Sequence, residues 1–307
     1  MKSRFFSTLA VALILLANIS SCAKKGELGS VDNPVKLYFT PSVDGDVIAK
    51  NSETFIKFLE KETGLFFKSG IPTNYIAVVE AFGSDRADIA VMNSFGYLLS
   101  NTKYGAEAKL KVLRHGSDHY YGQIITHVDN NINTLEDLKG KSFAFTDPSS
   151  TSGYMFPLKM LKDKNVSLGN TVFAVKHDNV VTMVYQKQVN AGATFHSPAS
   201  SDGKIKDARE RVLTQFPDVE KKVKIIAVTE AIPNDPFVFR KGLPKEITDK
   251  FIAAVKKFIE TPEGKEVFEK IYSVNGVVDA SDTDYNVLRE MVAKVGVNAE
   301  EVLKTAK

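Results

Sequence analysis

The stretch that decides the fold is KSFAFTDPSSTSGYMFPLKMLKDK, residues 141–164. It opens with an apolar run at 142–145, typical of a short buried strand, and Asp147 and Pro148 end that run. Residues 150–153, three hydroxyl side chains and a glycine, then lead into apolar residues at helical spacing. The stretch therefore predicts a strand, a polar turn and the start of a helix.

The three hydroxyl residues of this turn, Ser150, Thr151 and Ser152, indicate an anion site. The first turn of a helix carries main-chain N–H groups without intrahelical partners and a partial positive charge. Hydroxyl donors, together with Gly153, which lets the main chain approach closely, can surround a small oxyanion there. The alternative is ordinary helix capping, which Ser and Thr commonly provide. A cap needs one hydroxyl, whereas this turn has three in a row.

The N-terminus has the pattern of a secretory signal peptide. Lys2 and Arg4 precede an apolar run at 5–17, and small residues and Cys22, the one cysteine of the sequence, follow it. The run is too short for a comfortable membrane span. The pattern resembles a bacterial lipobox, in which Cys22 would become the lipidated first residue of the mature protein. The alternative is a plain signal peptide with a chance cysteine.

Composition limits what the mature chain can do. Removing residues 1–21, which contain Lys2 and Arg4 and no acidic residue, takes the formal net charge from +3 to +1. A near-neutral surface argues against broad nucleic-acid binding. The remaining chain of about 280 residues is long enough for two lobes with separate cores. Because no cysteine is left for disulfides, the core must hold the fold.

Strand and helix patterns alternate along the mature chain, which predicts an α/β fold with parallel sheets. The charged segment 200–222 is predicted to be helical, with an interruption at Pro217. Ligands of such sheets collect beyond the carboxyl ends of strands. Polar residues predicted at strand ends are Thr40, Asn93, Ser150 to Ser152 and His177.

Four residues are further candidates for ligand contact, each with an ordinary alternative. His177 lies between a predicted strand and a predicted helix, where it can donate to an anion or be a solvated loop residue. Asp235 lies between two prolines, which favour a set geometry but also fit an ordinary turn. Tyr75 and Tyr120, each taken alone, are more typical of packing than of ligand contact.

Enzyme and metal signatures are missing from the sequence. It has no G-x-S-x-G, H-E-x-x-H, G-x-G-x-x-G or Walker motif. His115 and His119 are four residues apart, but Gly116 between them argues against a helix and hence against a metal site. We therefore expect no cofactor, no bound metal and no enzymatic activity.

The motif DPSSTSGY at 147–154, with Pro157 after it, resembles the signature of phosphate-, phosphite- and phosphonate-type substrate-binding proteins of ABC importers. The resemblance covers most of the mature chain, about residues 35–275, and its pieces occur in the family's order. The weaker pieces are DIA from Asp88, YYG from Tyr120, LEDLKGK at 135–141, VNAGA at 189–193 and IPNDP at 232–236. The chain departs from the family pattern at Asn190 and at 196–198.

The family implies a two-lobed, type II periplasmic-binding-protein fold, in which each lobe is a mostly parallel sheet flanked by helices. The chain would cross between the lobes near Thr126 and Thr229. The implied division is a signal peptide at 1–21, lipidated Cys22 and a tether at 22–34, lobe 1 at 35–126 and 229–277, lobe 2 at 127–228, and a C-terminal helical extension at 278–307.

The resemblance also implies a site between the lobes. Ser150, Thr151 and Ser152 would donate to a phosphorus oxyanion. Asp235 would accept a hydrogen bond from a protonated ligand oxygen or from a ligand substituent. The residues that would complete the site are His177, Tyr75 and Tyr120.

Together these expectations describe a periplasmic or otherwise extracytoplasmic lipoprotein, anchored to a membrane and monomeric. It would deliver a phosphonate, phosphite or phosphate to an ABC permease, and it would not bind nucleic acid. A sensory lipoprotein that uses the same clamp to signal to a membrane partner is the alternative. A hydrolase of small phosphoesters is a third hypothesis, but it needs an activating base or metals that the sequence does not offer.

Overall fold

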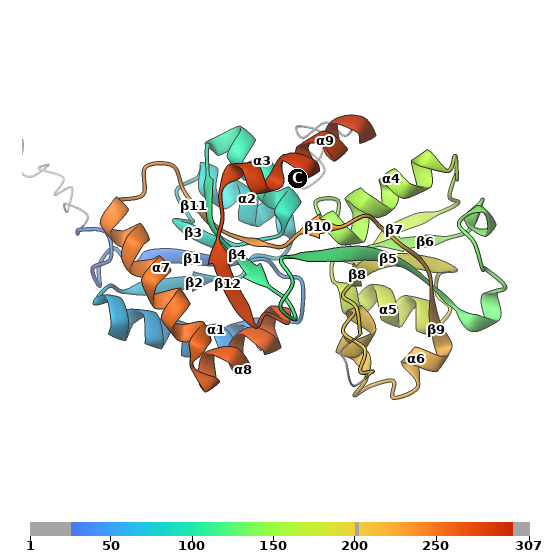
Figure 1. Ribbon diagram of the computed structural model, residues 1–307, viewed down its shortest axis with the longest axis horizontal. Helices are drawn as coiled ribbons and strands as arrows, with labels where there is room; N and C mark the ends of the chain where they lie inside the picture. Colours follow the sequence, from blue (N-terminus) through green and yellow to red (C-terminus); the bar gives the residue numbers. More distant parts are fainter. Residues whose placement is uncertain (1–25, 200–202, 297–307) are drawn as a thin grey trace, which may run out of the picture.

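The computed structural model describes residues 26–199 and 203–296. Over these ranges the chain folds into two α/β lobes, each built around a six-stranded sheet (Figure 1). The predicted two-lobed α/β architecture is thereby confirmed, but the sheets are mixed rather than mostly parallel as predicted, because the strands that follow the crossings run antiparallel to their neighbours. The predicted signal peptide, Cys22 and the last part of the C-terminal extension lie outside the described residues.

The sheet of lobe 1 has the strand order β12-β4-β11-β3-β1-β2. β1 pairs in parallel with β2 and β3, whereas β11 runs antiparallel to β3 and β4, so the sheet is mixed. Because β1 and β3 run side by side in one direction, Thr40 and Asn93, which follow them, come to the same edge. The strands are β1 (Val35–Phe39), β2 (Phe67–Gly70), β3 (Ile89–Val91), β4 (Glu107–Leu113), β11 (Pro236–Phe239) and β12 (Gly276–Asp279).

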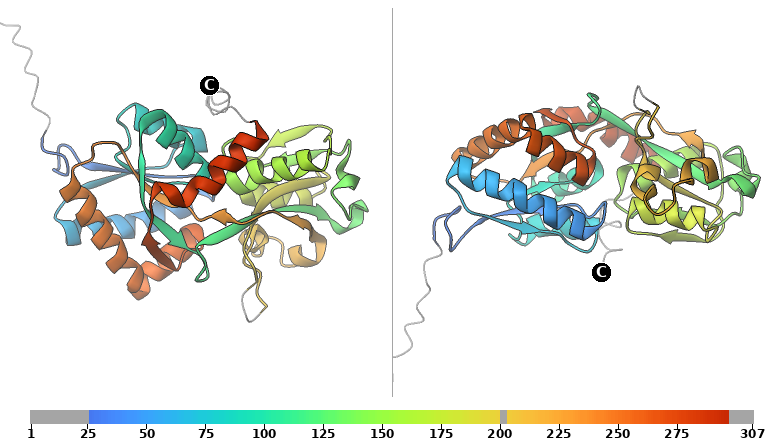
Figure 2. Two further views of the ribbon diagram at one scale, coloured as in Figure 1. Left: turned by 45° about the horizontal axis from the view of Figure 1, so that its top comes forward. Right: turned by 90° about the horizontal axis from the view of Figure 1, so that it is seen from below.

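Helices cover both faces of this sheet (Figure 2). On one face lie α1 (Gly45–Thr63), α7 (Lys245–Glu260) and α8 (Pro262–Tyr272), and their aromatic rings form the core. The ring of Phe55 lies 5.2 Å from that of Phe258 and 5.0 Å from that of Phe268. On the other face lie α2 (Tyr75–Gly83) and α3 (Ser94–Tyr104). Successive strand residues feed the two cores in turn, as the two-residue period of a strand requires.

The sheet of lobe 2 has the order β10-β5-β8-β6-β7, with β9 also paired to β5. β6 pairs in parallel with β7 and β8, and β5 is antiparallel to its partners. The strands are β5 (His119–His127), β6 (Phe143–Phe145), β7 (Thr171–Phe173), β8 (Ala191–His196), β9 (Val223–Val228) and β10 (Ile232–Pro233). The helices are α4 (Phe156–Asp163), α5 (His177–Tyr185) and α6 (Val219–Lys222), with short helical turns η1 (Val128–Asn130), η2 (Glu136–Leu138), η3 (Thr151–Met155) and η4 (Ala208–Val212).

Two short connections join the lobes. Residues 114–118 lead from β4 to β5, and residues 234–235 lead from β10 to β11. The crossings were expected near Thr126 and Thr229. Thr126 lies inside β5, and Thr229 lies between β9 and β10, so both residues belong to lobe 2. A strand pattern does not say which sheet the strand joins, because that is decided by partners far away in the chain.

The last described helix, α9 (Asn286–Val295), lies across the two lobes (Figure 2). It follows the turn η5 (Asp282–Tyr285) and packs on α3 of lobe 1 and on α4 of lobe 2. Leu288 and Met291 of α9 are buried in a cluster that also contains Phe156 of α4. Lys162 of α4 donates to the main-chain oxygen of Val295 at 3.0 Å. The lobes are therefore held together on this side by apolar packing, in addition to the two chain connections between them.

The helix predicted at 200–222 is wrong for the described residues 203–222, where only η4 and α6 are helical. Asp207 accepts hydrogen bonds from the main-chain N–H and the guanidinium of Arg209, and such local bonds compete with helix formation. The short strands β2, β10 and β12 were not predicted, since they offer too few residues for a periodic pattern. Among the described residues no helix has the length and apolarity needed to span a membrane.

Candidate functional site

The polar turn after β6 is a wide helical turn, η3, that leads directly into α4. The N–H of Met155 donates to the main-chain oxygen of Ser150, five residues back, at 3.0 Å. Ser150 Oγ accepts from the N–H of Gly153 at 3.1 Å, so it caps the turn, as the ordinary alternative proposed. A β-carbon on Gly153 would lie 2.1 Å from Thr146 Oγ1, so only glycine fits there. Such π-helical turns occur frequently at functional sites.

A cavity of about 50 Å³ lies between the lobes, against this turn. Six of the seven predicted ligand contacts line it: Tyr75, Tyr120, Ser150, Ser152, His177 and Asp235. Thr40 and Asn93, predicted at strand ends, line it as well. The remaining wall residues are Ser42, Val43, Val91, Met92, Arg114, Phe195, Arg211, Ile271 and Tyr272.

Thr151 does not line the cavity; its hydroxyl is buried in a contact between the lobes. Thr151 Oγ1 accepts from Asn93 Nδ2 at 3.1 Å and from the N–H of Phe95 at 2.9 Å. Asn93 Nδ2 also donates to the main-chain oxygen of Ser149 at 2.7 Å. The turn of lobe 2 is thus docked on the first turn of α3 in lobe 1, and the cleft is closed.

His177, the first residue of α5, is buried and neutral. Burial first, and then the positive charges of Arg211 and Arg114, lower the pKa of His177 to about 3. Its Nδ1 accepts from the N–H of Phe195 at 3.3 Å and lies 2.9 Å from Thr194 Oγ1. Because a main-chain N–H can only donate, the ring proton belongs on Nε2. His177 is therefore a neutral donor in the cavity wall.

Tyr75 and Asp235 each present a buried polar atom without a partner. Tyr75 Oη has none in the structure, and burial raises the pKa of this hydroxyl well above its usual value. Asp235 Oδ2 accepts from Arg114 Nη2 at 2.6 Å, whereas Asp235 Oδ1 is buried and unpaired. Buried polar groups in native proteins are nearly always hydrogen-bonded, so unpaired ones in a cavity wall indicate a ligand.

Arg114, which sequence analysis did not select, fixes Asp235 at the crossing between the lobes. Its other two hydrogen bonds reach Asn234 Oδ1 at 3.0 Å and the main-chain oxygen of Tyr272 at 2.9 Å. The guanidinium also lies over the ring of Tyr120, 5.1 Å from its centroid. The only signal that the sequence offered was the position of Arg114 at the end of a predicted strand.

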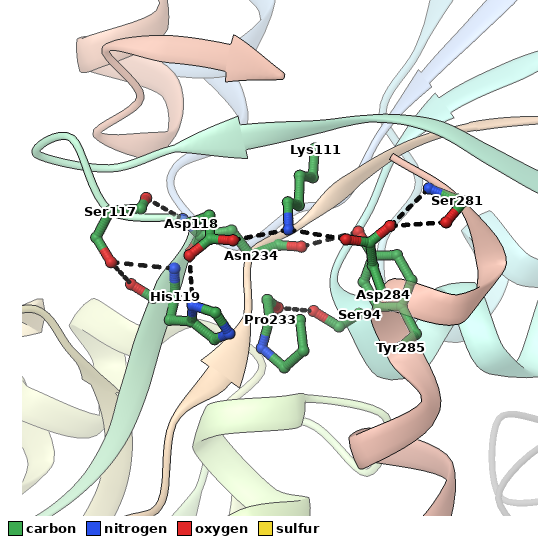
Figure 3. A network of polar contacts seen from close by, with 10 residues as sticks. All are labelled: Ser94, Lys111, Ser117, Asp118, His119, Pro233, Asn234, Ser281, Asp284 and Tyr285. Carbon is green, nitrogen blue, oxygen red and sulfur yellow. Dashed lines mark hydrogen bonds and ion pairs between the residues drawn. The ribbon is translucent and has the colours of Figure 1, made fainter. Parts of the chain in front are cut away.

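The two crossings are tied together by a polar network (Figure 3). Lys111 of β4 donates to Asp118 Oδ2 at 2.8 Å and to Asp284 Oδ1 at 3.0 Å. The N–H of Asn234 donates to the oxygen of Asp118 at 2.9 Å, and Tyr285 Oη donates to the oxygen of Asn234 at 3.0 Å. Asp235, the next residue, is held in place by this network rather than by its flanking prolines alone.

Arg211 of η4 is the second arginine of the cavity wall. Its Nη2 donates to Ser273 Oγ at 2.8 Å and its Nη1 to the oxygen of Lys270 at 3.2 Å, both across the cleft. Its Nε is buried without a partner. Nothing in the sequence distinguished Arg211 from the other charges of its segment, which look like a solvated surface.

The two departures from the family pattern lie away from the cavity. Asn190 Oδ1 accepts from the N–H and the hydroxyl of Ser142, which joins the starts of β6 and β8. His196 Nδ1 lies 2.9 Å from Gln123 Oε1 on the neighbouring strand. Neither Asn190 nor His196 is part of the cavity wall. Within the described residues no cluster of three His, Cys, Asp or Glu has the geometry of a metal site.

Two curated relatives share the sequence pattern. The "Phosphonates-binding periplasmic protein" of Escherichia coli is 26% identical over 228 residues, which cover 71% of this chain and 64% of that protein. The match thus spans slightly less than two thirds of that relative. The "Phosphate-import protein PhnD" of Mycolicibacterium smegmatis is 24% identical over 316 residues, covering 94% of this chain and 95% of the relative.

Two solved structures share the fold. A binding protein component of an ABC phosphonate transporter from Pseudomonas aeruginosa superposes with a TM-score of 0.75 at 21% identity, covering 89% of this chain and 93% of that one. A Prochlorococcus marinus protein in complex with methylphosphonate gives a TM-score of 0.73 at 19% identity, covering 85% and 98%. These similarities support the two-lobed binding-protein fold.

The family model described as "ABC transporter, phosphonate, periplasmic substrate-binding protein" matches residues 37–285. This range contains both sheets apart from the first two residues of β1, both crossings and every residue that lines the cavity. Proteins of this family bind a transport substrate and are not enzymes. The chain therefore belongs to the periplasmic phosphonate-binding family of ABC-transporter substrate-binding proteins.

Proposed function

We propose that this protein binds a phosphorus oxyanion, a phosphonate, phosphite or phosphate, in the interlobe cavity and delivers it to an ABC permease. The observation that carries the proposal is the set of unpaired buried atoms in the cavity wall. Tyr75 Oη and Arg211 Nε are donors without acceptors, and Asp235 Oδ1 and Asn93 Oδ1 are acceptors without donors. An oxyanion with one P–OH group satisfies both kinds at once.

The neighbouring hydroxyls fit the same ligand. Ser150 and Ser152 line the cavity at the first turn of a helical segment, and His177 offers a neutral N–H. Neutral donors of this kind hold an anion through many short hydrogen bonds without a full countercharge. The names of the two relatives, one for phosphonates and one for phosphate, point to the same chemical class.

A thermal shift measurement on the purified mature protein tests the proposal. We expect phosphate, phosphite, methylphosphonate or 2-aminoethylphosphonate to raise the melting temperature by several degrees, because a ligand that binds only the folded state stabilises it. Sulfate is the control, because it carries no proton for Asp235 Oδ1 at neutral pH. No shift with any of the four would contradict the proposal.

We further propose that Cys22 carries a lipid that anchors a monomeric protein outside the cytoplasm. The support is the sequence pattern of residues 1–22. Cys22→Ser should release the protein from the membrane fraction, and mass spectrometry of the wild-type N-terminal peptide should show the lipid. An unmodified Cys22 in the mature protein would disprove the anchor.

Delivery to a permease is separable from signalling. A strain lacking this protein should lose uptake of the bound oxyanion when that compound is its phosphorus source. Normal uptake combined with a lost transcriptional response would instead support a sensory lipoprotein.

A further inference from the structure

Arg211 reaches from lobe 2 across the cleft, and two of its three nitrogens are already occupied there. Nη2 and Nη1 donate to Ser273 and to the oxygen of Lys270 in lobe 1, at 2.8 and 3.2 Å. Nε has no partner although it is buried, and the residue lines the cavity. An unpaired buried donor of a charged group is costly, so an acceptor in the cavity is needed to complete its hydrogen bonding.

The charges of the cavity wall do not balance. Arg114 and Arg211 contribute two positive charges, and Asp235 contributes the one carboxylate. Asp235 is already bonded to Arg114 at 2.6 Å, and His177 is neutral. Among the residues of the cavity wall, Arg211 is therefore the one whose charge has no opposite partner in the wall, so this charge is available to a ligand.

Three carboxylates outside the wall also act on Arg211 and partly offset its charge from that side. Glu210 and Glu269 act on Arg211, but Lys206 pairs with both, at 3.2 and 3.6 Å. Asp178 also acts on Arg211 without lining the cavity. Within the wall itself, an ammonium group would meet the guanidinium of Arg211 and would find Asp235 as the one carboxylate, already paired with Arg114.

The cavity is also small. Its volume of about 50 Å³ compares with on the order of 10–15 Å³ for one water molecule on the same measure. The closed cleft therefore has room for about three to five atoms the size of oxygen, which is a single tetrahedral group. A two-carbon chain ending in an amine extends beyond that.

We propose that Arg211 restricts the closed cleft to compact oxyanions without a cationic substituent, such as phosphate, phosphite and methylphosphonate, and disfavours aminoalkylphosphonates. The inference rests on the proposed binding of a phosphorus oxyanion and deepens it. Arg211 acts as a specificity residue, because its unpaired Nε is available to a ligand in the cavity that it lines, while its other nitrogens hold the lobes together. The same contact links occupancy of the cavity to lobe closure.

Calorimetric titration with matched ligands tests this. Methylphosphonate is the compact ligand. Propylphosphonate and 2-aminoethylphosphonate have the same chain length, but one ends in a methyl group and the other in an ammonium group. We expect the wild type to bind methylphosphonate most tightly and propylphosphonate at least about fivefold more tightly than 2-aminoethylphosphonate, because like charges in a desolvated site repel. In Arg211→Gln the ratio of the affinity for propylphosphonate to that for 2-aminoethylphosphonate should fall toward one.

A control separates specificity from closure. Lys176→Gln removes another interlobe cation, which pairs with Asp44 at 3.3 Å and lies outside the cavity wall, away from the carboxylates around Arg211. This variant should weaken the binding of all three ligands equally and leave the ratio of their affinities unchanged. If Arg211→Gln binds too weakly to measure, Arg211→Lys decides, since a retained positive charge should retain the preference, and a lost preference overturns the inference.

The outcomes are distinct. No binding of any phosphorus ligand by the wild type would refute the proposed function itself. Wild-type binding of 2-aminoethylphosphonate as tight as that of propylphosphonate would overturn the inference while leaving the function standing. The inference would also be overturned if Arg211→Gln left the ratio of the affinities for propylphosphonate and 2-aminoethylphosphonate unchanged.

Discussion

Arg114 donates from Nη2 to Oδ2 of Asp235 at 2.6 Å, and the other oxygen of the same carboxylate, Oδ1, is buried without a partner in the wall of the interlobe cavity. One oxygen of Asp235 is thus used to fix the side chain, and the other remains available as an acceptor. An acceptor in that position requires a proton from the ligand. This relationship makes the protonation state of the ligand a determinant of binding.

Asp235→Asn should narrow the preference for phosphate over sulfate. The amide can offer an N–H to sulfate, whereas the native carboxylate finds no proton there. We expect the ratio of the two affinities to change by about five- to a hundredfold, the equivalent of about 1–3 kcal/mol for a buried unpaired group. Asp118→Asn is the matched control, since Asp118 bonds Lys111 at the crossing and does not line the cavity. Titration of both anions that gives an unaltered ratio in Asp235→Asn would contradict this role.

Ser152→Ala should weaken binding, because Ser152 lines the cavity. A hydrogen bond to a charged group contributes about 1.5–3 kcal/mol, so the Kd should rise by about ten- to a hundredfold. Ser149→Ala is the control in the same turn. The Ser149 hydroxyl donates to Asp147 Oδ1 at 2.7 Å and does not reach the cavity, so its loss should lower the melting temperature and leave the Kd nearly unchanged. Equal effects of both variants on the Kd would indicate that the hydroxyls matter only for folding.

Thr151→Val should open the cleft rather than remove a ligand contact. Valine keeps the shape of threonine but leaves the buried N–H of Phe95 without the acceptor that it now finds at 2.9 Å. The unpaired group should disfavour the closed form by about 1–3 kcal/mol. Apparent affinity then falls with the population of the closed form. Small-angle scattering should show a larger radius of gyration without ligand than for the wild type; identical scattering and Kd would count against the docking role.

His177 should make stability depend on acid pH. Its pKa is lowered to about 3 in the folded protein by burial first, whereas the unfolded chain has the ordinary value near 6.5. Between these two values the unfolded state binds more protons, so stability rises with pH in this window and is lost as pH falls from about 6.5 toward 3. As the pH falls through this window, the free energy of unfolding of the ligand-free protein should therefore fall less steeply in His177→Gln than in the wild type.

Three other histidines also have pKa values that burial, as the leading cause, lowers: His115, His127 and His196. They contribute equally to the pH dependence of the wild type and of His177→Gln, so the difference between the two proteins reports His177 alone. Urea unfolding at pH 7, 6, 5 and 4 gives the comparison. Parallel profiles for the two proteins would show that His177 is not buried and neutral as described.

The sequence by itself determined the elements and the chemical character of the site. Apolar spacing locates most strands and helices, and the sequence alone marks the hydroxyl-rich turn, His177 and Asp235 as candidate ligand contacts. These features are local, since a helix, a strand or a polar turn is specified by residues within a few positions of one another. The order of motifs also predicted the two-lobed fold, which the sheets confirm.

Tertiary structure alone decided which of these groups meet and what each one contacts. Thr151, expected in the cavity, is turned toward Asn93 and Phe95, more than fifty residues away in sequence. Arg211, which looked like a surface charge, crosses the cleft to Ser273. Contacts over such separations depend on how two lobes dock. No local pattern encodes that docking, because it is the burial of one surface against another that places a charged side chain in a cavity or in solvent.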